Sequence, residues 1–397
     1  MSNLENYMKQ QAIFCEQNDS ISKNLYSEYG VKRGLRDEKG QGVLTGLTNI
    51  SDIKAFEYHD GVKSPCDGEL SYRGYNIKDL VTGSKGKRFV FEEGAYLLLF
   101  GELPTDTQLM EFQGRLSDCM ELPTNFTRDV IMKAPTSDIM GSMTRSILTL
   151  GSYDKEKESL EIPNVLRQSM QLIAVFPMLA VYAYHAYCHY EKNESMYIHR
   201  PEKDLSIAEN FLRLLRPDTK FTELEARVLD IALLLHMEHG GGNNSTFTTR
   251  VVTSSGSDTY SVISAAMSSL KGKKHGGANL MVMNMMDDIK SHVKDYEDEE
   301  EIASYLSKIL KKEAFDQKGL IYGMGHAVYS ISDPRERVFK GFVEQLARDK
   351  GREKDMTLYN NIEKIAPKLI AKQRQIFKGV SPNIDFYSGF VYDMLNI

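Results

Sequence analysis

Residues 323–335 read Gly-Met-Gly-His-Ala-Val-Tyr-Ser-Ile-Ser-Asp-Pro-Arg, the most specific pattern in the chain. No Gly-Lys-Ser/Thr follows the glycines, so this is not a phosphate-binding P-loop, and a lone Gly-x-Gly is a weak sign of a dinucleotide site. His326 precedes Arg335 by nine residues. An imidazole can polarise a carbonyl and an arginine fork pairs with a carboxylate, so we interpret the pair as serving one keto-acid.

The nine histidines of the chain fall into two groups. Four lie beside glycines, in the segments 235–244, 273–279 and 322–328, where backbone or ligand can approach closely. The other five have no glycine-rich or acidic company and are interpreted as surface or structural residues: His59, His185, His189, His199 and His292.

The segment 235–244 contains His236, Glu238 and His239 and therefore raises the question of a metal site. The His-Glu-x-x-His order of zinc proteases and its inverse are both absent, so we predict no metal. We expect a helix to end near His239, and His239 with the glycine-rich turn to offer hydrogen bonds to a small anionic ligand.

His275 stands where a loop becomes a helix in Lys-Lys-His-Gly-Gly-Ala-Asn (273–279). The free N–H groups at a helix start disfavour imidazolium, so we expect a neutral imidazole that donates a hydrogen bond, which suits enolisation. The basic residues around Lys273 fit two readings equally, a contact with phosphate or a solvated turn.

Asp385 lies in Pro-Asn-Ile-Asp-Phe-Tyr-Ser-Gly (382–389), between apolar and aromatic neighbours. Partial burial would raise its pKa toward that of a useful general base. An aspartate in a Pro-Asn turn is also a common structural element, so both readings stay open at this point.

The wider pattern is helical. Thr222-Glu223-Leu224-Glu225 is a capping box, and Val228, Ile231, Ala232 and Leu235 keep the i, i+3, i+4, i+7 spacing of a helix. Strand-like alternation is scarce, so the predicted fold class is mostly α. Residues 169–188 carry no formal charge and are long enough to cross a bilayer, but Pro177 interrupts them, and we favour a buried or interface helix.

Composition sets the broad class of the protein. The 397 residues are 41% hydrophobic and 26% charged with a net charge of −6, which argues against a dedicated nucleic-acid or membrane-surface binder. The first twenty residues hold no apolar run, so we expect a cytoplasmic protein. Four widely spaced cysteines indicate neither a disulfide framework nor a thiolate zinc site: Cys15, Cys66, Cys119 and Cys188.

Taken together, the segments 236–239, 275–279, 323–335 and 382–389 resemble citrate synthase, in the same order along the chain. Upstream segments at 34–48, 70–75 and 97–104 resemble the same family. The resemblance implies a two-domain helical homodimer, with a large domain at 1–276 to which 390–397 return, and a small domain at 277–389 that closes over the site. It also implies no metal and no cofactor, with acetyl-CoA and oxaloacetate as substrates.

The resemblance assigns a role to each candidate residue. Asp385 removes a methyl proton of acetyl-CoA, His275 donates a hydrogen bond to the thioester oxygen, and His326 polarises the oxaloacetate carbonyl. The remaining residues are implied to bind the dicarboxylate (His239, Asn243 and Arg335) or to lie along coenzyme A (Tyr322, Gly323, Met324 and Gly325).

Several features distinguish this chain from the family pattern. Met324 replaces a frequent aromatic residue, Ser330 and Ile331 stand where a basic residue usually precedes Asp-Pro-Arg, and Lys273-Lys274 replace a usual Pro-Leu. Two alternatives remain: a 2-methylcitrate synthase that uses propionyl-CoA, and a non-catalytic helical dimer of the same fold. Family members usually continue for tens of residues with further dicarboxylate-binding arginines, so we expect weak oxaloacetate binding from these 397 residues.

Overall fold

The computed structural model describes residues 2–18, 21–37, 39, 42–43, 45–84, 87–273, 276–326, 328–375 and 379–397. Internal contacts divide the chain into two units, residues 1–47 and residues 48–397. The domain boundary predicted between residues 276 and 277 falls inside the second unit and stays a prediction.

The first unit contains two helices, α1 (Asn3–Asn18) and α2 (Lys23–Glu28), and neither of them buries a side chain. Short backbone bridges join Arg33 to Arg36 and Arg36 to Gly42.

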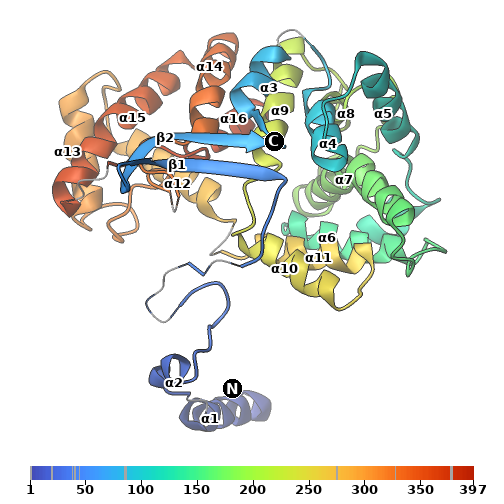
Figure 1. Ribbon diagram of the computed structural model, residues 1–397, viewed down its shortest axis with the longest axis horizontal. Coiled ribbons are helices and arrows are strands. Elements are labelled where there is room, and N and C mark those ends of the chain that lie inside the picture. Colours follow the sequence, from blue (N-terminus) through green and yellow to red (C-terminus); the bar gives the residue numbers. More distant parts are fainter. Residues whose placement is uncertain are drawn as a thin grey trace. The chain divides into compact units, whose positions relative to one another are not determined.

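The second unit is built mainly from helices, which confirms the mostly α fold class (Figure 1). In chain order they are α3 (Ile77–Gly83), α4 (Val90–Phe100), α5 (Asp106–Asp118), the π-helix η1 (Thr127–Ile131), α6 (Ile139–Gly151), α7 (Ile162–Lys192), α8 (Ile207–Leu215), α9 (Glu223–His236), α10 (Asn244–Ser254), α11 (Thr259–Leu270), α12 (Ala278–His292), α13 (Glu299–Leu310), α14 (Pro334–Asp349), α15 (Glu353–Arg374) and α16 (Asp385–Met394).

A β-hairpin precedes these helices, and the sequence reading passed over it. The strands β1 (Ser51–His59) and β2 (Val62–Tyr72) pair antiparallel, with Ser51 opposite Tyr72, and the short β3 (Tyr75–Asn76) extends the sheet. The turn at Asp60-Gly61 takes positive φ at both residues, 51° and 80°, which is the geometry that Asp-Gly favours in a two-residue hairpin.

Helix α9 forms as its sequence predicts. The Thr222 hydroxyl accepts a hydrogen bond from the Glu225 N–H, the Glu225 side chain returns one to the Thr222 N–H, and both interactions of the capping box are present. The periodic apolar residues are buried, and the helix ends at His236, close to the predicted end.

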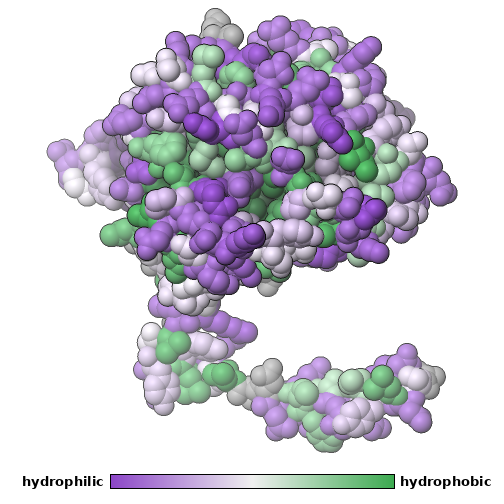
Figure 2. Space-filling model, turned by 90° about the vertical axis from the view of Figure 1, so that its right-hand side faces the viewer, coloured by the Kyte–Doolittle hydropathy of each residue, from purple (hydrophilic) through white to green (hydrophobic). Residues whose placement is uncertain are grey.

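Helix α7 contains the uncharged segment around Pro177. By length and composition it is the one helix among the described residues that could cross a membrane, but half of its apolar window is buried inside the protein. It packs against α5, α6 and α8, as expected of a core helix. On the face that Figure 2 shows, hydrophilic residues separate the apolar patches.

Helix α9 occupies the middle of the second unit. It contacts α4 and α8 on one side and α14 on the other, and α14 and α12 both contact α16 (Figure 1). This packing brings the C-terminus of α9 toward the N-termini of α14 and α16. Three of the predicted site residues lie at or just beyond these helix ends: His239, Arg335 and Asp385.

Candidate active site

Two predicted histidines share one neighbour, Tyr329. The Nε2 atom of His239, just beyond α9, lies 2.8 Å from the Tyr329 hydroxyl oxygen. The centroid of the His326 ring is 4.8 Å from that of Tyr329 and 5.3 Å from that of His239. Burial first, and then the positive charge of Arg335, lower the pKa of His239 to about 3, so that this imidazole is neutral.

The backbone around His326 fixes its tautomer. Its Nδ1 atom lies 2.9 Å from the Val328 backbone nitrogen and 3.3 Å from that of Tyr329, and both N–H groups donate to it. A nitrogen that accepts cannot carry the proton, so the neutral ring is protonated on Nε2. Burial lowers the pKa of His326 and favours this neutral form. The side chain therefore presents an N–H donor that can polarise a carbonyl.

Arg335 and Asp333 form a buried pair at the start of α14. The Asp333 carboxylate accepts from Nε of Arg335 at 3.1 Å and from its Nη2 at 2.9 Å, and also from the Ile384 N–H at 3.1 Å. Asp333 thus caps α14 and at the same time holds the start of α16. Within the described residues, the Nη1 atom of Arg335 makes no hydrogen bond and stays available to a ligand.

The predicted coenzyme-binding turn is anchored to the chain that precedes α16. Gly323 and Gly325 both have a φ of 84°, a conformation that glycine adopts readily. The Gly325 N–H donates to the Ser381 carbonyl at 2.8 Å, and the Asn383 side-chain amide donates to the Gly325 carbonyl at 2.7 Å. A Cβ on Gly323 would lie 3.0 Å from Cα of Phe386, so the turn packs closely on α16.

Asp385 is the first residue of α16 and is half-buried. Burial raises its pKa, while His236 and then the positive charge of Arg335 oppose the rise. Within the described residues its carboxylate oxygens accept no hydrogen bond. The positive charge of Arg335 lowers the pKa of His239, His326 and Asp385, so all three groups lie within electrostatic range of this guanidinium.

Other predicted residues are placed differently or lie outside the described residues. His275 lies outside them, although Gly276 and Gly277 next to it lead directly into α12, as predicted. The Asn243 side chain caps α10, where its oxygen accepts from the Thr246 N–H at 2.8 Å. The Tyr322 hydroxyl donates to Asp316.

Sequence reasoning missed several residues that shape the site. The Ser51 hydroxyl of β1 donates to Glu238 at 3.2 Å and accepts from the Gly240 N–H at 3.1 Å. On β2, the Gly68 N–H donates to the Ser332 hydroxyl at 3.0 Å. Tyr329 could have been noticed from its position three residues after His326, but the contacts of the hairpin depend on tertiary structure alone.

A pocket of about 290 Å³ opens beside His326. Its wall includes Met324 and Gly325 of the glycine turn, Tyr329, and Arg374 at the end of α15. The Arg374 guanidinium donates to the Gly319 carbonyl at 3.1 Å. A cationic side chain beside a backbone turn suits a ligand that carries phosphate groups.

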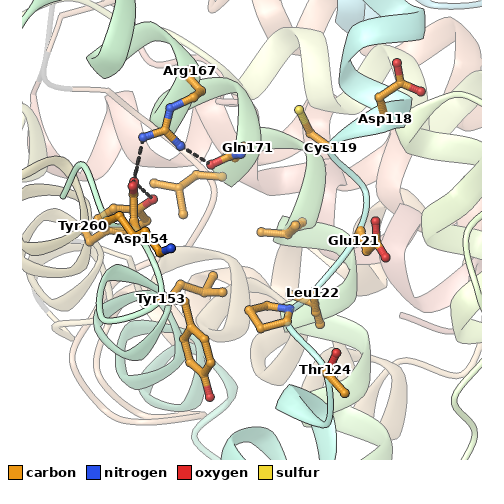
Figure 3. Close-up of a pocket in the computed structure, with 15 residues that line it drawn as sticks. Asp118, Cys119, Glu121, Leu122, Thr124, Tyr153, Asp154, Arg167, Gln171 and Tyr260 are labelled. Carbon is orange, nitrogen blue, oxygen red and sulfur yellow. Dashed lines mark hydrogen bonds and ion pairs between the residues drawn. The ribbon is translucent and has the colours of Figure 1, made fainter.

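A separate pocket of about 490 Å³ contains none of the predicted site residues (Figure 3). Arg167 faces into it but is held by Asp154 at 2.9 Å and by Gln171 at 3.1 Å, and Tyr260 donates to the same aspartate at 2.7 Å. The charges of Arg167 and Asp154 therefore satisfy each other. Among the described residues, no group of three His, Cys, Asp or Glu side chains is arranged to hold a metal ion, and the predicted lack of a metal stays a prediction.

Comparison with known proteins identifies similar chains. The family model "Citrate synthase, C-terminal domain" matches residues 37–397. A citrate synthase from Synechocystis is 33% identical over 358 residues, which cover 89% of this chain and 80% of that protein. A 2-methylcitrate synthase from Shewanella oneidensis is 33% identical over 83% of this chain and 78% of its own length. The crystal structure of citrate synthase from Pyrobaculum aerophilum superposes with a TM-score of 0.73 at 27% identity, covering 91% of this chain and 83% of that one.

Proposed function

The chain belongs to the citrate synthase family, and from this premise we propose that it condenses acetyl-CoA with oxaloacetate and hydrolyses the citryl thioester to citrate and CoA. One arrangement supports this reaction above the others: Asp333 holds the Arg335 guanidinium and also accepts from the Ile384 N–H, next to Asp385, while His326 with its Nε2–H lies beside His239.

Asp385 is the general base of the first step. Its carboxylate is half-buried and accepts no hydrogen bond from a described residue, so its lone pairs are available to take a proton from the acetyl methyl carbon. Burial raises the pKa of this carboxyl group, which strengthens it as a base. The donation of a hydrogen bond by His275 to the thioester oxygen stays a prediction.

His326 acts on the second substrate. Its Nε2–H donates to the ketone oxygen of oxaloacetate, and the developing negative charge on that oxygen strengthens this hydrogen bond in the transition state. The enol carbon of acetyl-CoA then attacks the polarised ketone carbon of oxaloacetate, and a carbon–carbon bond forms. Two backbone N–H groups donate to Nδ1 and exclude a proton from that nitrogen. The neutral ring therefore keeps its single proton on Nε2, where it can reach the ketone oxygen.

Arg335 and His239 hold the carboxylates of the dicarboxylate substrate. The Asp333 pair fixes the plane of the guanidinium and leaves Nη1 for one substrate oxygen. The Tyr329 contact fixes the ring of His239 in the same way. We assign Asn243 a smaller part, because its side-chain oxygen is occupied as a helix cap and only its amide is left to bind a carboxylate.

Coenzyme A is proposed to lie along residues 322–325 and to enter the pocket beside His326. Met324 and Gly325 line this pocket. The Tyr322 hydroxyl is held by Asp316, so we assign only the ring of Tyr322 to the coenzyme. Arg374 is an added candidate for the phosphates that Ser330 and Ile331 cannot bind.

A homodimer is part of the proposal. Helix α10 has no buried residue, and it packs on α11, which in turn packs on α6. These three helices expose large apolar side chains, namely Leu148, Val251 and Leu270. A second copy of the chain would cover them, and sedimentation velocity should then report twice the 45.1 kDa chain mass. A cytoplasmic location also stays a prediction.

The test of the reaction is release of free CoA thiol from acetyl-CoA in the presence of oxaloacetate. We expect a higher kcat/KM with acetyl-CoA than with propionyl-CoA. One methylene changes selectivity by only about 10–200-fold, so both substrates must be measured. Thiol release from neither thioester would favour the non-catalytic dimer, and a preference for propionyl-CoA would favour 2-methylcitrate synthase.

A further inference from the structure

A buried and a half-buried carboxyl group lie side by side, on α14 and α15. Glu336, in the first turn of α14, is 3% exposed and is hydrogen-bonded to the side chain of Glu363 on α15. Two carboxyl groups can share a hydrogen bond only if one of them carries a proton. The Oε1 atom of Glu336 is buried and has no hydrogen-bond partner, so no described residue supplies a compensating donor there.

Glu363 extends this contact to a third helix. The hydroxyl of the fully buried Tyr387, on α16, donates to the Glu363 carboxylate. Lys340, one turn after Glu336 on α14, pairs with the same carboxylate at 2.8 Å. Helices α14, α15 and α16 therefore meet at one polar cluster, which we call the Glu336 cluster and define as Glu336, Lys340, Glu363 and Tyr387.

The Glu336 cluster lies directly behind two site residues. Glu336 follows Arg335 in the chain, and Tyr387 is two residues beyond Asp385. A hydrogen bond from the Ile384 N–H to Asp333 also links the start of α16 to the start of α14. The Glu336 cluster thus fixes the spacing between the two helices that present the guanidinium and the carboxylate base.

The surrounding charges favour the protonated state of Glu336. Burial first, and then the negative charge and hydrogen bond of Glu363, raise its pKa, and only Lys340 opposes the rise appreciably. The titratable groups that face the cluster come from α14, α15 and α16: Asp333, Lys340, Glu344, Glu363 and Tyr387.

We propose that Glu336 is a positioning residue, which as a neutral acid donates a hydrogen bond to Glu363 and so holds Asp385 on α16 at a fixed distance from Arg335 on α14. The proposal rests on the proposed function only in taking Asp385 as the base. Glu336 itself touches neither substrate.

The first test is the pH dependence of unfolding. Folding raises the pKa of Glu336 from its ordinary value of 4.5 to about 9. The protonated Glu336 therefore stabilises the fold fully below pH 4.5, and this stabilisation is lost as the pH rises toward about 9. Glutamine keeps a donor and cannot ionise. The Tm of E336Q should therefore rise relative to wild type across this window, whereas E353Q, an exposed glutamate at the start of α15, should follow wild type. A Tm difference that does not change with pH would overturn the proposal.

The second test measures the position of α16 without turnover. In E336A, hydrogen exchange of the amides 386–389 should accelerate by tenfold or more, and E336Q should restore the wild-type rate. In the same variants, kcat should fall by roughly 10–100-fold in E336A and be largely rescued in E336Q, with a smaller change in the KM for oxaloacetate. Unchanged exchange in E336A would refute the positioning role. Absence of thiol release from wild type would instead count against the proposed function, and leaves the exchange and unfolding tests decisive.

Discussion

The Tyr329 hydroxyl oxygen lies 2.8 Å from Nε2 of His239, and the two residues are separated by ninety positions in the chain. Burial raises the pKa of Tyr329, so the phenol keeps its proton and can donate it to Nε2. His239 then carries its own proton on Nδ1, the nitrogen that is left for a substrate carboxylate. A residue outside the predicted set thus determines which atom of His239 faces the ligand.

Removing this hydroxyl should weaken oxaloacetate binding. In Y329F the aromatic packing against His326 is kept, and only the hydrogen bond to His239 is lost. Such a bond contributes about 0.5–1.5 kcal/mol, so KM for oxaloacetate should rise by about three- to tenfold with a smaller change in kcat. Steady-state kinetics check this result, and Y58F on the exposed end of β1 is the control. An unchanged KM in Y329F would show that the contact does not orient His239.

The donor role of His326 predicts a graded loss of activity. H326A removes the Nε2–H and should lower kcat by about 10²–10³-fold, as the loss of other single transition-state donors does. In H326Q the side-chain amide can place a neutral N–H near the same position, so it should keep more activity than H326A. Equal activities of the two variants would contradict the assignment of Nε2–H as the working donor.

The role of Asp385 as general base predicts the loss of kcat on its substitution and the pH dependence of kcat/KM. D385N should lower kcat by about 10²-fold or more, because the amide cannot accept the methyl proton. The wild-type base works only when ionised, so kcat/KM should fall as the pH drops through its pKa, and burial moves that fall above the ordinary value of 3.8. A pH profile of kcat/KM measures this position. Near-normal turnover by D385N would refute the assignment.

The close approach of β2 to the site predicts a stability effect. A Cβ on Gly68 would lie 2.2 Å from the Ser332 carbonyl oxygen and 2.6 Å from Cδ1 of Tyr329, so G68A forces the backbone apart. We expect the free energy of unfolding to fall by about 1–3 kcal/mol.

The control for this substitution is G114A. Gly114 lies inside α5, and a Cβ there meets no atom within 4 Å. This alanine should stabilise the protein by about 0.5–1 kcal/mol, because it reduces the entropy of the unfolded chain. Denaturant unfolding distinguishes the two, and a G68A variant as stable as G114A would show that the β2 contact is looser than described.

Local signals predicted the helical part of the structure well. The capping box at Thr222 and the apolar spacing after it define α9, because both act within one helix and need no tertiary contact. The hairpin carried a local signal too, since Asp60-Gly61 is a strong turn pair, but β1 and β2 do not alternate cleanly because much of the hairpin is only partly buried.

The sequence predicted which residues belong to the candidate site, but not the hydrogen bonds and long-range contacts that hold them. His326, Arg335 and Asp385 could be chosen from their neighbours in the chain, and the charge of Arg335 acts on the pKa of both other residues. The partner of Arg335 is Asp333, which a local reading leaves as a helix cap. Contacts across tens of residues, such as that of Glu336 with Glu363, depend on how α14 and α15 pack and leave no trace in the spacing of residues.

The β-hairpin connects two segments of the candidate site. Ser51, opposite Tyr72, forms hydrogen bonds with Glu238 and Gly240. Gly68, four residues before Tyr72 on β2, donates a hydrogen bond to Ser332. Gly68 lies where the register of β1 and β2 shifts, between the pairs Lys54–Glu69 and Phe56–Pro65. The hairpin is therefore attached to both segments that form the hydrogen bond between His239 and Tyr329. Lengthening β2 by two residues between Gly68 and Tyr72 should displace these segments relative to each other and break that hydrogen bond, although no catalytic residue is substituted.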